Sequence, residues 1–262
     1  MAMGKRGPKP KGKVKIEWSA DFAYAIGLIA TDGCVSNDGR HITFVSKDKE
    51  QIDNFIKCLK ISNKIGISYS GYKRSRAYRI QFGSVDFIAF LKSIGIGPAK
   101  SLTMGPLGVP DKYFLDFLRG CFDGDGYSHS YWDKRWRSSF MFYLGFVSAS
   151  PAFIHWLKRK IRELTHIEGH ITRAYKKNMC FQLKYSKYSA LELASRMYAR
   201  PKCICLSRKK LKIIETSAMI SRFPSESRYL NEDTRRWRNW YTRAFEGRMP
   251  QGLGVQIPPC AH

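Results

Sequence analysis

The chain repeats one pattern of elements, and each copy opens with a segment rich in glycine and aspartate. GLIATDG at 27–33 aligns with GCFDGDG at 120–126, and FVSKDKEQI at 44–52 aligns with FVSASPAFI at 146–154. The offset between the copies grows from 93 to 102 residues, so the second copy carries a nine-residue insertion. An internal repeat constrains the fold more than composition does, because both copies must form the same supersecondary unit.

Hydrophobic periodicity predicts the element order αββαββα for each copy, and hence a mixed α/β fold with two pseudo-symmetric repeats. The predicted helices cover residues 18–33, 49–60, 85–96, 113–122, 151–165 and 190–198. Two strand pairs lie between the helices of each copy. The predicted boundaries give a flexible basic arm, two repeats and an irregular basic tail, at residues 1–17, 18–108, 109–215 and 216–262.

The charge balance is strongly basic. Lys and Arg number 46 against 21 Asp and Glu, a formal net charge of +25. Such a charge opposes compaction, so a polyanionic partner is expected, with nucleic acid first and a membrane surface second. No run of about 18 apolar residues could span a bilayer, and the start of the chain lacks the apolar core of a secretion signal. Scattered cysteines without a CxxC pair predict a reducing compartment, so we expect a cytoplasmic protein.

AIGLIATDG (25–33) and LRGCFDGDG (118–126) each end a predicted helix and precede strands. With the doubled element order and the basic composition, they resemble the two motifs of monomeric LAGLIDADG homing endonucleases. The resemblance covers about residues 18–215. It implies a monomer with the motif helices side by side and two saddle-shaped antiparallel sheets on double-stranded DNA. It also implies a long recognition site and Mg²⁺-dependent phosphodiester hydrolysis, with one active site per strand.

The resemblance implies two structural roles for the motif glycines. Gly27 and Gly120 have no side chain, so they are expected to let the two motif helices touch. Gly33 and Gly126 are expected to end the helices in the left-handed conformation that suits glycine.

Asp32 and Asp125 close the two motifs and are predicted to be catalytic. Their carboxylate oxygens suit Mg²⁺, with main-chain carbonyls of adjacent motif residues as further ligands. An acidic residue at a helix C-terminus opposes the helix dipole, so finding one in both copies favours a function. Asp123 holds the first acidic position of its motif, where the first copy has Ala30. We interpret it as a packing residue or an accessory carboxylate.

Lys47 matches a lysine that proteins of this family place near the metal site, after the second strand. It is predicted to be an accessory catalytic residue that polarises water or phosphate; the alternative is an exposed lysine at a strand end. The second copy has Ala149 at this position. The missing lysine predicts unequal cleavage of the two DNA strands, or nicking of one.

Strand alternation predicts the DNA-binding surface. In AYRIQFG and MCFQLKY, apolar residues alternate with polar ones, so one face packs on helices and the other faces solvent. Arg, Lys and Gln suit base edges because their donors pair with guanine or adenine acceptors, and basic turns add phosphate contacts. The predicted DNA-binding residues are Tyr72, Lys73, Arg74, Arg76, Arg79, Gln81, Lys134, Arg135, Arg137, Arg173, Lys176, Lys177, Gln182 and Lys184.

The tail suggests where such a gene resides. GVQIPP back-translates to a stretch containing GTTCAAATCC, which is typical of the T-loop of a transfer RNA gene. We interpret the tail as read-through from an intron into a flanking exon, which fits an intron-encoded endonuclease.

Two alternative functions use the same scaffold. One is an RNA maturase that binds its host intron RNA, and the other is a catalytically inactive DNA-binding protein. Intact Asp32 and Asp125 favour the nuclease, because a pure binding protein need not keep them. No helix-turn-helix pattern of an added regulatory domain is visible in the sequence.

Overall fold

The computed structural model describes residues 14–69, 75–135, 139–175 and 179–221. The first repeat contains α1 (Ala20–Thr31), β1 (Gly33–Val35), β2 (His41–Ser46), α2 (Lys49–Leu59), β3 (Gly66–Tyr69), β4 (Arg76–Gly83) and α3 (Val85–Ser93). The second contains α5 (Phe114–Asp123), β5 (Tyr127–Trp132), β6 (Phe140–Ser148), α6 (Pro151–Thr165), β7 (His170–Tyr175), β8 (Met179–Ser186) and α7 (Lys187–Met197). The predicted αββαββα order is confirmed in both copies.

Three elements lie outside the repeated pattern. The linker between the repeats contains α4 (Lys100–Thr103) and the short 3-10 helix η1 (Asp111–Tyr113), and α8 (Ser207–Ser221) follows the second repeat. Helix α8 was not predicted, and it runs six residues past the predicted start of the irregular tail at 216. Its basic sequence has only a weak apolar stripe, so contacts with both repeats hold it in place.

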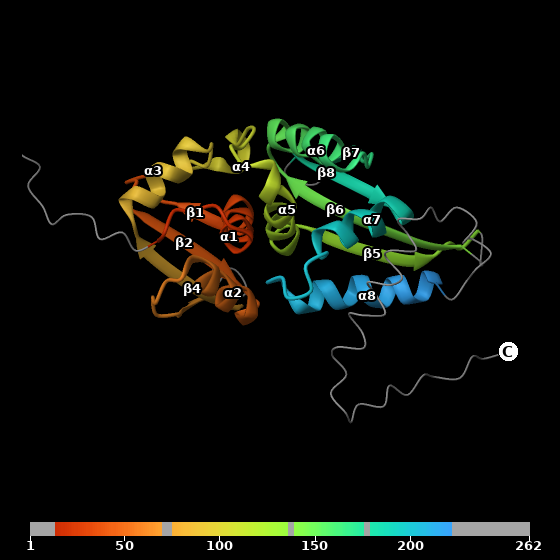
Figure 1. Ribbon diagram of the computed structural model, residues 1–262, viewed down its shortest axis with the longest axis horizontal. Helices are drawn as coiled ribbons and strands as arrows, with labels where there is room; N and C mark the ends of the chain where they lie inside the picture. Colours follow the sequence, from red (N-terminus) through yellow and green to blue (C-terminus); the bar gives the residue numbers. More distant parts are fainter. Residues whose placement is uncertain (1–13, 70–74, 136–138, 176–178, 222–262) are drawn as a thin grey trace, which may run out of the picture.

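Each repeat forms one four-stranded antiparallel sheet, with strand orders β1-β2-β4-β3 and β5-β6-β8-β7. Figure 1 shows the motif helices α1 and α5 side by side at the centre, with one sheet on either side of them. The α1–α5 contact is more extensive than any other between helices. All residues from Phe22 to Ala30 of α1 are buried, because this helix lies between its own sheet, α2 and α5.

The backbones of α1 and α5 touch at Gly27 and Gly120. A Cβ atom on Gly27 would lie 2.2 Å from the carbonyl oxygen of Phe117 and 2.9 Å from the Cα atom of Gly120. A Cβ atom on Gly120 would lie 2.1 Å from the carbonyl oxygen of Tyr24. Any side chain at either position would push the two helices, and with them the two repeats, apart.

Among the described residues, no helix combines the length and the apolar character that crossing a membrane requires.

Candidate active site and nucleic-acid interface

The paired motif helices end beside one another and bring one aspartate from each repeat to a common centre. Asp32 directly follows α1, and Asp125 lies two residues beyond α5. An Oδ atom of Asp32 lies only 3.0 Å from where a Cβ atom of Gly124 would stand, so Asp32 reaches the motif of the other repeat.

The electrostatics of the two carboxylates agree with this proximity. Burial, and then the negative charge of Asp125, raise the pKa of Asp32 to about 6, while Lys209 and Lys100 lower it. Loss of hydration raises the pKa of Asp125, and the positive charges of Lys100 and Lys209 lower it. Repulsion between like charges raises a carboxyl pKa when the groups are close. The centre therefore holds two mutually repelling acids and two cations.

The prediction for Gly33 and Gly126 is wrong, because neither glycine adopts the left-handed conformation expected at the end of a helix. Among the described glycines, positive φ angles occur at Gly39 and Gly95. Space explains the motif glycines instead. A Cβ atom on Gly33 would lie 2.7 Å from the Cα atom of Ile29, and one on Gly126 would lie 2.5 Å from the carbonyl oxygen of Phe122. The chain turns back tightly against each helix and leaves no room for a side chain.

Asp123 borders the hollow that Asp32 lines, but the residue is buried in the core, with 1% of its surface exposed. Its carboxylate accepts hydrogen bonds from the hydroxyl of Tyr24 at 2.8 Å and from the backbone N–H of Leu206 at 2.7 Å. The hydroxyl of Tyr198 lies 3.5 Å from its other oxygen. Burial raises the pKa of Asp123 to about 6, and these hydrogen bonds oppose that rise. Asp123 thus joins helices and is not available as an accessory metal ligand.

Lys47 and Asp32 line the same hollow, of about 390 Å³, beside the end of α1. Gln51, Gly124 and Arg208 line it as well, so the hollow lies between elements of both repeats and α8. This geometry gives Lys47 access to a group bound at Asp32. Ala149 is half-buried at the end of β6 and offers no such charge to Asp125.

Two lysines that sequence reasoning missed lie at the ends of the motif helices. The ammonium of Lys100, on α4, donates a 2.9 Å hydrogen bond to the carbonyl oxygen of Thr31. The ammonium of Lys209, on α8, donates to three carbonyl oxygens at the end of α5, those of Phe122, Gly124 and Gly126, at 2.7, 2.8 and 2.6 Å. Burial lowers the pKa of Lys209 to about 8. Lys100 lies on the element after α3 and Lys209 on the element after α7, beyond the segments that were aligned between the copies, so the alignment gave no signal for them.

Helix α8 is fixed by residues of the first repeat. The carboxylate of Glu50 accepts the backbone N–H of Ser207 at 3.1 Å, which satisfies a free donor at the start of α8. Arg208 forms an ion pair with Asp48, with Nη2 and Oδ2 2.7 Å apart. Because Glu50 and Asp48 lie at the start of α2, the first repeat positions the lysine that contacts the second motif.

The donor set at this centre suits a hard divalent cation. Two carboxylates offer oxygen ligands of the kind that Mg²⁺ prefers. Within the described residues, no group of three or more His, Cys, Asp and Glu side chains gathers into a larger metal site. A cation at this centre would therefore depend on Asp32 and Asp125, with water or phosphate oxygens completing its coordination.

The solvent face of the first sheet presents the predicted polar residues. Ile80 and Phe82 of β4 are buried, while Arg79 and Gln81, which alternate with them, are exposed, so the predicted alternation is confirmed. Arg79 pairs across the sheet with Val45 of β2, on the strand that leads to Lys47. This face is thus continuous with the hollow beside Asp32.

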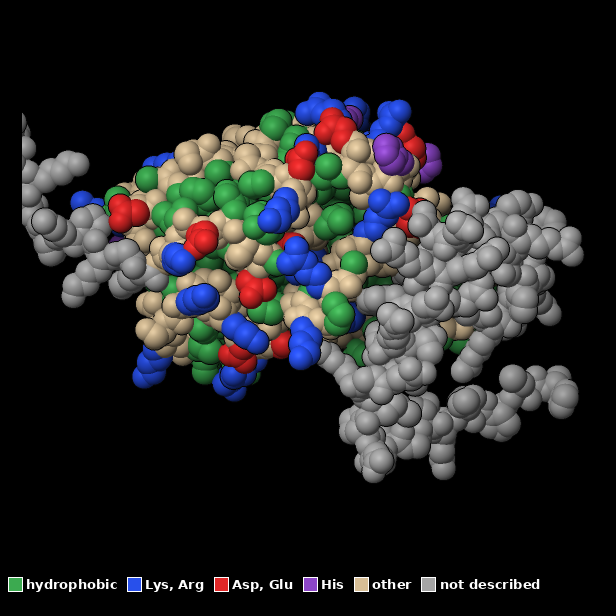
Figure 2. All heavy atoms as spheres, viewed as in Figure 1, with side chains coloured by type: hydrophobic (Ala, Val, Ile, Leu, Met, Phe, Trp, Pro, Cys, Tyr) green, Lys and Arg blue, Asp and Glu red, His purple; other side chains and the backbone are tan. Residues whose placement is uncertain are grey.

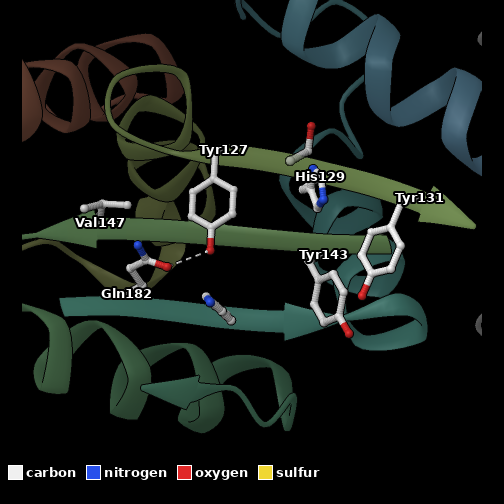
Figure 3. A pocket seen from close by; sticks show the side chains of 8 residues that line it. Tyr127, His129, Tyr131, Tyr143, Val147 and Gln182 are labelled. Carbon is white, nitrogen blue, oxygen red and sulfur yellow. Dashed lines mark hydrogen bonds between the residues drawn. The ribbon is translucent and has the colours of Figure 1, made fainter. Parts of the chain in front are cut away.

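The solvent face of the second sheet is aromatic. Phe181 and Leu183 of β8 are buried, whereas Gln182 and Lys184, which alternate with them, line an open hollow of about 670 Å³. Figure 3 shows the ring of Tyr127 lying across β6, with its hydroxyl donating to Oε1 of Gln182 at 3.3 Å. The other residues lining this hollow are Ser128, His129, Tyr131, Tyr143 and Val147.

Gly145 makes room for that ring. A Cβ atom on Gly145 would lie 2.5 Å from the ring of Tyr127. The aligned strand of the first repeat has Thr43, and Cys34 aligns with Tyr127. The solvent faces of the two sheets therefore differ, small and basic in the first repeat and aromatic in the second.

Two of the predicted DNA-binding arginines, Arg76 and Arg173, lie on the side of their sheet that carries the buried residues and not on its solvent face. Arg173 pairs with Phe181 across β7 and β8, and its guanidinium lies 5.9 Å from the centre of that ring. Arg76 lies two residues from Tyr78 and 5.6 Å from its ring centre. Partners across antiparallel strands, and residues two apart, share a side of the sheet. Arg76 was predicted to belong to a basic turn, whereas it is the first residue of β4.

The remaining predicted DNA-binding residues fall into two groups. Lys134 and Arg135 are exposed after β5, and Arg135 pairs with Asp133 at 3.3 Å. The other predicted DNA-binding residues lie outside the described residues: Tyr72, Lys73, Arg74, Arg137, Lys176 and Lys177. The basic arm up to residue 13 and the tail from residue 222 lie outside them as well.

Figure 2 shows one face of the molecule, with basic and acidic side chains interspersed on the part of this face where described residues are in view. A mixed surface of this kind does not attract a polyanion in the way a single-sign surface does.

Comparison with known proteins identifies the fold. Residues 19–95 match the family described as LAGLIDADG-like domain. The solved structure of the homing endonuclease I-WcaI bound to its DNA recognition sequence is similar, with a TM-score of 0.53 and 15% identity over 80% of this chain and 95% of that chain. The I-LtrWI LAGLIDADG homing endonuclease bound to target DNA gives a TM-score of 0.51 and 10% identity over 86% and 97% of the two chains.

One curated protein is also similar. It is a probable translation initiation factor IF-2 from Methanocaldococcus jannaschii, 26% identical over 251 residues, or 88% of this chain. The chain spans only 19% of the length of that protein.

Proposed function

We propose that this chain, which carries a LAGLIDADG-like domain and the two-repeat LAGLIDADG fold, is a metal-dependent, site-specific endonuclease that cuts double-stranded DNA. The observation that carries the proposal is the convergence of Asp32 and Asp125, one from each repeat, at the end of the paired helices. A structural scaffold has no need of two repelling carboxylates at one partly buried point, because each raises the free energy of the folded state at neutral pH.

The chain's own residues would divide the chemistry between the repeats. Asp32 and Asp125 would hold Mg²⁺ through carboxylate oxygens, and a bound cation supplies the charge that activates water and stabilises the leaving oxygen. Lys47, in the hollow beside Asp32, would orient the water or the phosphate of one strand. The second repeat has no such lysine at Ala149, so we propose that the two strands are cut at different rates.

The two sheets would bind the halves of one long DNA site. Arg79 and Gln81 in the first repeat, and Gln182 and Lys184 in the second, offer donors to base edges in the major groove. Both halves of the site are bound by one chain, so a monomer suffices. The likeness to DNA-bound homing endonucleases supports a homing role, in which the gene is carried by an intron and the cut promotes its copying.

The test works without a known target sequence. A library of long randomised duplexes is incubated with the full chain, with and without Mg²⁺, and cut ends are sequenced. The wild type is expected to give one enriched site, whereas Asp32→Asn and Asp125→Asn give none. Asp86→Asn, an exposed substitution on α3, is the control and should cut like the wild type. Specific DNA binding without cleavage would assign the chain to the DNA-binding alternative instead.

A further inference from the structure

Each motif aspartate is preceded by a carbonyl group that already has a cationic partner. The residue before Asp32 is Thr31, whose carbonyl oxygen accepts from Lys100 at 2.9 Å. The residue before Asp125 is Gly124, whose carbonyl oxygen accepts from Lys209 at 2.8 Å. The two contacts are equivalent in the pseudo-symmetric structure.

The two lysines lie on the elements that follow the third helix of each repeat. Lys100 lies on α4, after α3, and Lys209 lies on α8, after α7. The charge therefore has the same position in both halves of the structure. Ammonium groups at helix C-termini are favourable, and here each one also faces the acid centre.

The lysines balance the charge of that centre. Each of Lys100 and Lys209 interacts electrostatically with both Asp32 and Asp125. Lys100 is buried, with 7% of its surface exposed. Lys209 directs hydrogen bonds to three carbonyl oxygens, which uses all the donors of an ammonium group. Two positive charges therefore lie beside the two carboxylates, and Lys209 also interacts with the buried carboxylate of Asp123.

We propose that Lys100 and Lys209 are tethered counter-cations, which hold the carbonyl oxygens and the acid pair until a divalent cation displaces them. The inference rests on the proposed metal-dependent function of the same site. The lysine side chain is long and flexible, so each ammonium can leave its carbonyl and turn to a DNA phosphate. In the free protein, the two lysines lower the affinity for metal and keep the motif ends together.

The test measures binding of Mn²⁺ alone to the full chain without DNA, by the loss of the free-ion signal in electron paramagnetic resonance. Removing one positive charge beside a doubly charged ion is expected to tighten binding by roughly tenfold or more. Lys209→Met and Lys100→Met should therefore each bind Mn²⁺ more tightly than the wild type. Lys209→Arg, which keeps the charge, should bind like the wild type.

The matched control is Lys212→Met. Lys212 lies on the same helix and also bonds a carbonyl oxygen, that of Ser128 at 2.9 Å, but away from the aspartates. Its loss should leave Mn²⁺ affinity unchanged. Circular dichroism shows whether each variant folds. The two lysines lie at different helix ends, so if one variant does not fold, the folded variant still tests the inference.

Unchanged or weaker Mn²⁺ binding by a folded Lys209→Met or Lys100→Met variant would overturn the inference. Tight Mn²⁺ binding by a double variant that also carries Asp32→Asn would overturn it as well, since the ion would then lie away from Asp32. Failure of the proposed endonuclease function would appear separately, as absence of Mg²⁺-dependent cutting by the wild type.

Discussion

The hydroxyl of Tyr24 donates a 2.8 Å hydrogen bond to the carboxylate of Asp123, across the interface of the two motif helices. The same carboxylate accepts the N–H of Leu206 at 2.7 Å, just before α8 begins. One buried acid therefore joins the first repeat, the second repeat and the segment that delivers Lys209. This connection holds together the two motif helices whose ends carry Asp32 and Asp125.

Replacing Tyr24 with phenylalanine should weaken that connection. The buried carboxylate loses a charge-assisted hydrogen bond, so the free energy of unfolding is expected to fall by about 2 kcal/mol. Urea denaturation followed by fluorescence measures the change. Tyr69→Phe, at a side chain that is 64% exposed, should leave the midpoint unchanged. Equal midpoints for Tyr24→Phe and the wild type would mean that the bond adds nothing to stability.

Alanine at Gly120 should force α1 and α5 apart. Its methyl group would stand 2.1 Å from a carbonyl oxygen of the facing helix, and backbone cannot rotate away as a side chain can. We expect a loss of about 3 kcal/mol or more in the free energy of unfolding. Gly97→Ala is the matched control, because nothing lies within 4 Å of its added Cβ atom. Similar melting temperatures for the two variants would contradict the close helix contact.

Asparagine at Asp32 should make the metal-free protein less sensitive to pH. The folded-state pKa of about 6 lies above the ordinary 3.8. The protonated carboxyl therefore favours folding below about pH 4, and that contribution disappears as pH rises through 6. At pH 7.5 in chelator, Asp32→Asn should exceed the wild type in stability by about 1 kcal/mol, and at pH 4 the two should converge. Denaturation series at both pH values decide the matter, with Asp86→Asn expected to follow the wild type.

Alanine at Arg79 should weaken DNA binding in a way that depends on salt. Loss of one cation at the DNA surface is expected to reduce the slope of log affinity against log salt by about one. Fluorescence anisotropy with a labelled duplex over a series of salt concentrations gives the slope. Arg159, on α6, pairs with Glu163 and lies outside the sheet surface, so Arg159→Ala should keep the wild-type slope. The same loss in both variants would point to a general charge effect.

Local sequence determined the repeated architecture. The αββαββα order follows from hydrophobic period, and the alternation of buried and exposed residues in β4 and β8 follows from the two-residue period of a strand. The closeness of the two motif helices followed from Gly27 and Gly120, because a residue without a side chain has few other uses in the middle of a buried helix. These features depend on neighbours in the chain or on the repeat, so an alignment of the two copies was enough to predict them.

Tertiary structure alone decided what surrounds the aspartates. Lys100 lies 69 residues from Thr31, whose carbonyl oxygen accepts its hydrogen bond, and Lys209 lies 84 residues from Asp125. Both lie beyond the segments that were aligned between the copies, and no local pattern distinguishes them from other lysines of a basic chain. The conformation of Gly33 was likewise decided by space beside Ile29. Electrostatic and steric contacts of this kind depend on distance in three dimensions, which sequence separation does not encode.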